Sequence, residues 1–122
     1  MPSEYQQEPD VGRTFGSIIL GKWMEVMKLS EEWRQGFMLG TPNLELTAEY
    51  ISKMTRLWGA LEPKVKGRTD LRQLEHEFEL YRKYCYNPRA LNEPENAEDI
   101  FKMEAIMEEV LDKLKITKFE YD

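Results

Sequence analysis

The chain has 122 residues, of which 41% are hydrophobic and 33% charged, a composition that suits one soluble helical domain better than a disordered chain. Its net charge of −6 disfavours non-specific binding of the whole chain to nucleic acid or to anionic membranes. The single cysteine, Cys85, excludes an intrachain disulfide, and the polar N-terminus has no signal-peptide pattern, so we expect a reducing, cytoplasmic location.

The N-terminal half predicts a tail followed by two helices. Residues 1–11 are polar and acidic and predict a flexible tail, whereas residues 12–122 predict a single helical domain. Apolar residues recur with a four-three rhythm over residues 13–38, which predicts the first helix, and Gly40 ends it. Thr47 is the expected N-cap of the second helix, and Pro63 is expected to stop it.

The C-terminal half predicts two further helices. The third is expected to open at Asp70, with Gln73 completing a capping box, and to close at Asn87. Its apolar seam comprises Leu71, Leu74, Phe78, Tyr81 and Cys85. The fourth is expected to begin near Asn96, and its seam comprises Ile100, Met103, Met107, Val110 and Leu114. Together these segments predict an all-α, four-helix bundle-like single domain.

The first and fourth predicted helices carry more apolar side chains than one buried seam requires. The additional rows are Leu20, Met24, Met27, Phe101, Ile106 and Leu111. Monomers seldom leave large apolar patches exposed, so a second copy, a protein hetero-partner or a tighter intrachain arrangement must cover these rows. We favour a non-enzymatic protein-interaction or assembly module that associates with itself or with a partner protein.

The centre of the chain is basic and lies between two acidic arms. Residues 53–89 carry a net charge of +4, whereas residues 1–52 carry −4 and residues 90–122 carry −6. The candidate anion or nucleic-acid contacts are Lys64, Lys66, Arg68, Arg72, Arg82 and Lys83. The alternative function is therefore a nucleic-acid-associated regulator that uses residues 64–89.

A helix-turn-helix would be one form of such a regulator, because a Thr-capped helix is followed here by a turn and by a basic helix start. However, the connection from Leu61 to Asp70 is about twice as long as the turn of that motif, and the candidate reading helix carries Glu75, Glu77 and Glu79. We favour a solvated surface turn, in which Lys64 and Lys66 complement the dipole at the end of the second helix.

The sequence offers few groups for catalysis. His76 and Cys85 are nine positions apart, a spacing unlike that of zinc ligands. On a continuous helix they would be separated by about 13 Å, so we expect Cys85 to be a buried hydrophobe and His76 to lie at the surface. No P-loop, dinucleotide-binding or nucleophile-elbow motif occurs. We therefore expect no enzyme activity, no cofactor and no membrane contact, and leave open a Mg²⁺ site built from carboxylates.

Overall fold

The computed structural model describes residues 15–41 and 43–116, and the part of the chain that it describes contains helices but no strand. The α-helices are α1 (Phe15–Met38), α2 (Leu44–Val65), α3 (Arg72–Glu79), α4 (Lys83–Tyr86) and α5 (Asp99–Lys113). Three short 3-10 helices connect them, namely η1 (Thr69–Leu71), η2 (Pro88–Asn92) and η3 (Pro94–Asn96). The expected all-α class is confirmed, and the expected tail of residues 1–11 lies outside the described residues.

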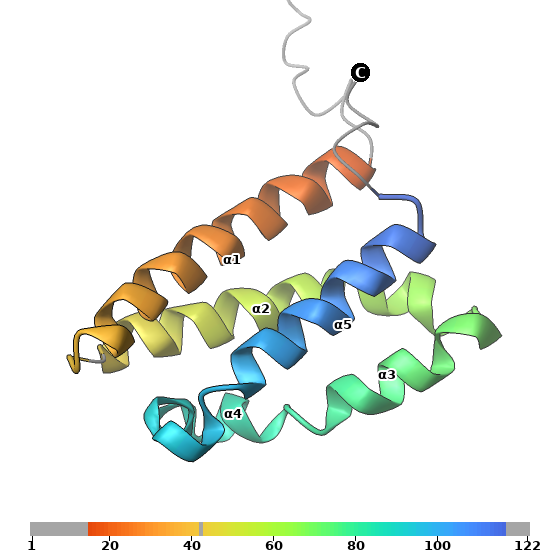
Figure 1. Cartoon of the computed structure of the whole chain (residues 1–122). Coiled ribbons are helices and arrows are strands. Elements are labelled where there is room, and N and C mark those ends of the chain that lie inside the picture. Colours follow the sequence, from red (N-terminus) through yellow and green to blue (C-terminus); the bar gives the residue numbers. More distant parts are fainter. Residues whose placement is uncertain (1–14, 42, 117–122) are drawn as a thin grey trace, which may run out of the picture.

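The helices form two packed layers around one core. α1 and α2 lie side by side as an antiparallel hairpin, and α5 lies over this hairpin with α3 beside it (Figure 1). Glu104 of α5 contacts Arg34 of α1 and Tyr50 of α2, which fixes α5 against both helices of the hairpin. The expected four-helix bundle describes this arrangement only approximately. The difference is that α4 and η2 form a short separate segment against α2.

The corner between α1 and α2 explains where α2 begins. Gly40 has a φ of +78°, and the Thr41 N–H donates to the carbonyl of Gly36 at 2.8 Å, so α1 ends in a left-handed glycine cap. Asn43 then caps α2 by accepting from the N–H of Leu46 at 3.1 Å. The expected cap at Thr47 was wrong: this residue lies one turn inside α2 and is fully buried.

The end of α2 also differs from expectation. Pro63 lies inside the helix, which continues to Val65, so the expected stop at Pro63 was wrong. Proline has no N–H to donate to the carbonyl four residues earlier, which costs one helical hydrogen bond. That loss is offset because continuing the helix buries the Val65 side chain completely.

The segment expected to form one third helix consists instead of η1, α3 and α4. Leu80, Tyr81 and Arg82 each donate a backbone hydrogen bond to the carbonyl three residues earlier, which tightens the chain and ends α3. After this break Tyr84, which is fully buried, faces the core, and Cys85 is exposed. The expectation of a buried Cys85 was wrong because the helical register does not continue through residues 80–82.

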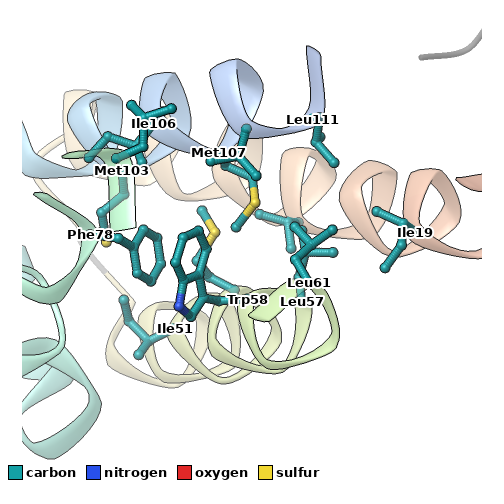
Figure 2. Close-up of a cluster of buried hydrophobic side chains, with 14 of the residues drawn as sticks. Ile19, Ile51, Leu57, Trp58, Leu61, Phe78, Met103, Ile106, Met107 and Leu111 are labelled. Carbon is teal, nitrogen blue, oxygen red and sulfur yellow. The ribbon is translucent and has the colours of Figure 1, made fainter. Parts of the chain in front are cut away.

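The core contains side chains from α1 and α2 of one layer and from α3 and α5 of the other (Figure 2). Trp58 of α2 lies at its centre and stacks on Phe78 of α3, with ring centroids 4.2 Å apart and an interplanar angle of 12°. The same core cluster includes Ile19, Ile51, Leu57, Leu61, Met103, Ile106, Met107 and Leu111. Full burial of each large apolar side chain stabilises the fold by about 2 kcal/mol.

Half of the additional apolar side chains of the first and fourth predicted helices are buried in the core of this single chain. Leu20, Ile106 and Leu111 are only 7%, 8% and 4% exposed within this single chain. Of the three kinds of cover considered from the sequence, the tighter intrachain arrangement covers these three side chains, because α5 lies in the space between the hairpin and α3 and buries a broad face. None of the described helices is long and apolar enough to cross a membrane.

Candidate interaction surface

The remaining apolar side chains of the predicted interface differ in exposure. Met24 is 65% exposed and Phe101 is 50% exposed, whereas Met27 is half-buried. The guanidinium of Arg34 lies over the Phe101 ring, 4.5 Å from its centroid. Part of the Phe101 surface is therefore already used in a contact within the chain.

Arg68 and Lys66, in the basic centre of the chain, pair with carboxylates from the same segment. Arg68 donates to both carboxylate oxygens of Asp70, at 2.9 and 2.7 Å, and holds the pKa of Asp70 below its usual value. The expected capping box at Asp70 was wrong, since no side chain caps η1 or α3. Lys66 pairs with Glu75 at 3.3 Å.

The other candidate anion contacts are dispersed. Arg82 forms salt bridges with Glu62 and Glu79 at 3.2 and 2.9 Å. The Lys64 ammonium lies 5.0 Å from the centroid of the Phe15 ring, and Lys83 lies 5.3 Å from the centroid of the Tyr84 ring. Arg72 is exposed and has no salt bridge to a described residue. This geometry matches the favoured surface turn more closely than a single phosphate-binding surface.

A different surface, which we name the α2 groove, is a shallow, open depression. It consists of two adjoining hollows of about 310 and 480 Å³ that share Ala48 and Pro88. The first hollow is also lined by Ile51, Ser52, Thr55, Arg56 and Cys85. The second is also lined by Leu44, Asn87 and Arg89. One wall is thus the outer face of α2, and the other is α4 with the start of η2.

A buried polar contact holds the η2 wall in place. Oδ1 of Asn92, at the end of η2, accepts from the indole N–H of Trp33 at 2.8 Å and from the hydroxyl of Thr47 at 2.8 Å. Trp33 and Thr47 belong to α1 and α2 and are 2% and 0% exposed. Buried donors of this kind are costly to leave unpaired, so Asn92 ties the groove wall to the helical hairpin.

A second contact holds the α4 wall. The Tyr84 hydroxyl of α4 donates to a carboxylate oxygen of Asp99 at the start of α5. Burial, and then the hydrogen bond to Asp99, raise the pKa of the Tyr84 hydroxyl above its usual value. Between these two ties, the side-chain amide of Asn96 donates to the carbonyl of Ala90 at 3.0 Å, which closes the connecting loop. The groove is therefore shaped by the fold before any partner arrives.

The chemistry of the groove is apolar and cationic. Ile51 is 5% exposed and forms part of the floor, while Leu44 is 40% exposed at one end. The Cys85 sulfur lies 3.1 Å from the Thr55 hydroxyl oxygen, so the thiol reaches the groove surface. Arg56 and Arg89 are exposed and form no salt bridge with any described residue.

Glu104 is a buried carboxylate outside the lining of the α2 groove, and both of its oxygens accept hydrogen bonds. Glu104 is 5% exposed, and its two oxygens accept from Arg34 at 2.6 Å and from the Tyr50 hydroxyl at 3.0 Å. Burial, and then the charge of Glu104, raise the pKa of Tyr50 well above its usual value. The described part of the chain brings no three His, Cys, Asp or Glu side chains together as a metal-binding group.

Sequence reasoning missed the α2 groove for an identifiable reason. A cap at Thr47 leaves Leu44 outside the second helix, and a buried Cys85 removes one residue of the opposite wall. Asn43 carried the missed signal, because asparagine is among the strongest N-caps. Models of known protein families, curated proteins and solved structures show no significant match to this chain.

Proposed function

We propose that this chain is a non-enzymatic protein-interaction module and that the α2 groove is its docking surface. The observation that carries this proposal is the groove itself, a hollow with a buried apolar floor and two exposed arginines without salt bridges to described residues. Preformed concave surfaces of this kind are characteristic of binding sites, because little conformational entropy is lost when a partner docks.

Two further exposed apolar side chains precede the groove residue Leu44 in the corner between α1 and α2. Met38 and Leu39 are 85% and 79% exposed at the end of α1, and Leu44 follows at the start of α2. Exposed apolar groups beside a groove favour contact with a protein, because their burial on binding releases them from water. These residues support protein binding in preference to the regulator of nucleic acid considered from the sequence.

The test is a selection of displayed random peptides on the full-length chain, followed by affinity measurements on two variants. Ala48→Gln places a larger neutral side chain at the centre of the groove, and the position is exposed and helical. Ala105→Gln, at an exposed position of α5 outside the groove lining, is the matched control.

We expect selected peptides to bind the native chain and Ala105→Gln equally, and to bind Ala48→Gln about tenfold more weakly. Far-UV circular dichroism verifies that both variants fold. If every selected peptide binds Ala48→Gln as tightly as the native chain, the groove is not the docking surface and the proposal is wrong.

A further inference from the structure

We propose that the partner segment received by the α2 groove is an acidic amphipathic helix. Its apolar side chains would lie over Ala48 and Pro88, and its carboxylates would lie near Arg56 and Arg89. This inference rests on the proposed function, since it names the kind of partner that the same groove takes.

The charged side chains that line the α2 groove are all cationic. No carboxylate lines either hollow of the α2 groove, although the chain contains 23 Asp and Glu residues. Two other hollows, between α1 and α2, contain both signs of charge; their charged linings are Lys22, Glu25, Lys28, Glu32, Glu49, Lys53 and Arg56. Arg56 therefore lies at the border between one of these hollows and the α2 groove, whereas Arg89 lines the groove alone. The α2 groove is thus a locally cationic site on an acidic molecule, which favours an acidic partner and disfavours a basic one.

The positions of Arg56 and Arg89 indicate where the partner segment would carry its carboxylates. Arg56 lines the first hollow, and Arg89 lines the second, so the two cations lie in different parts of the groove. The apolar lining shared by both hollows lies between them. A single small anion would contact one arginine, whereas a segment with two separated carboxylates and apolar side chains between them would use the whole groove.

The walls favour a helix over an extended segment. An extended peptide commonly adds to the edge of a sheet, and the described residues contain no strand. Proline-rich segments dock in grooves lined by aromatic side chains, and no aromatic side chain lines these hollows.

Length and side-chain size agree with a helix. From Leu44 to Thr55 the α2 wall extends about 17 Å, or about three helical turns. Ala48 and Ser52, one turn apart on this wall, are small and would allow the axis of a second helix to approach closely.

The experiment uses two fluorescein-labelled peptides of about 18 residues, long enough for five helical turns. Both carry leucines at i, i+4 and i+7 on one face. The acidic peptide has glutamates on its other faces, and the control peptide has lysines at the same positions. Fluorescence anisotropy gives their affinities for the full chain, for Arg56→Gln/Arg89→Gln and for Lys22→Gln/Lys28→Gln, which has the same net charge.

We expect the acidic peptide to bind the native chain and the Lys22→Gln/Lys28→Gln variant equally. Loss of both groove arginines should weaken binding about tenfold or more and should flatten its salt dependence, because two charge-assisted contacts are removed. Equal or tighter binding of the lysine peptide would overturn the inference, as would undiminished binding to Arg56→Gln/Arg89→Gln.

The same measurements separate this inference from the proposed function. If the lysine peptide binds and Ala48→Gln abolishes that binding, the groove is a docking surface and only the acidic partner is wrong. If neither designed peptide nor any selected peptide binds in a manner that depends on Ala48, both proposals fail. Light scattering gives the particle mass, and a dimer that dissociates in Ala48→Gln would replace the acidic helix with a second copy of this chain.

Discussion

Replacement of Asn92 by alanine tests how the fold shapes the groove, because one side chain ties η2 to the helical hairpin. Oδ1 of Asn92 accepts from Trp33 and from Thr47, both buried. The substitution removes the acceptor and leaves the indole N–H of the buried Trp33 side chain without its partner. An unpaired buried donor costs about 2 kcal/mol.

Thr47 contributes little to this cost. Its hydroxyl lies 2.9 Å from the Asn43 carbonyl as well as 2.8 Å from Asn92, and a hydroxyl has one hydrogen to donate. When Asn92 is replaced, the hydroxyl still has the Asn43 carbonyl as its acceptor. The loss therefore falls on Trp33, and we expect the free energy of unfolding to decrease by about 2 kcal/mol in Asn92→Ala.

A double-mutant cycle isolates the contact. In a Trp33→Phe background there is no indole N–H to strand, so Asn92→Ala should cost about 1–2 kcal/mol less than it does in the native chain. Urea unfolding followed by far-UV circular dichroism measures each variant. Asn92→Asp, which keeps an acceptor, should be closer to the native chain than Asn92→Ala. Equal costs of Asn92→Ala in both backgrounds would show that the Trp33 indole N–H does not depend on Asn92.

Two further predictions concern buried hydroxyls. The Ser30 hydroxyl is buried in α1 and has no hydrogen-bond partner among the described residues. Ser30→Ala should therefore raise the free energy of unfolding, measured by urea titration, by about 1 kcal/mol. A decrease in this free energy would show that the hydroxyl is paired. The raised pKa values of Tyr50 and Tyr84 mean that the unfolded chain loses these protons first as pH increases. Their stabilising contribution is therefore complete below about pH 10 and decreases above it, so Tyr50→Phe/Tyr84→Phe should lose stability less steeply above that pH, and parallel profiles would contradict this assignment.

Helical periodicity was sufficient to predict the elements whose apolar seams are long and regular. In α1, Ile19, Val26 and Trp33 face the core as their spacing indicated, and in α5, Met103 and Met107 do the same. Periodicity works here because the inward face of a long helix repeats every three or four residues.

Local sequence was insufficient where tertiary contacts decide the outcome. The break at Leu80 has no proline or glycine to mark it; it places Tyr84 against Asp99 and exposes Cys85. Burial of Ile106 depends on how deeply α5 lies between the hairpin and α3, which a single helix pattern does not encode. The α2 groove was missed for the same reason, since its two walls are more than 25 residues apart in sequence.

Chemical-shift mapping shows whether the α2 groove receives a partner segment. The acidic peptide is titrated into ¹⁵N-labelled full-length chain, and backbone amide shifts are recorded by NMR. We predict that the largest changes occur at Ala48, Ile51, Thr55 and Cys85, with little change at Glu25 and Lys28 on the mixed-charge hollow between α1 and α2. Shifts concentrated at Glu25 and Lys28, with the groove amides unmoved, would contradict the account.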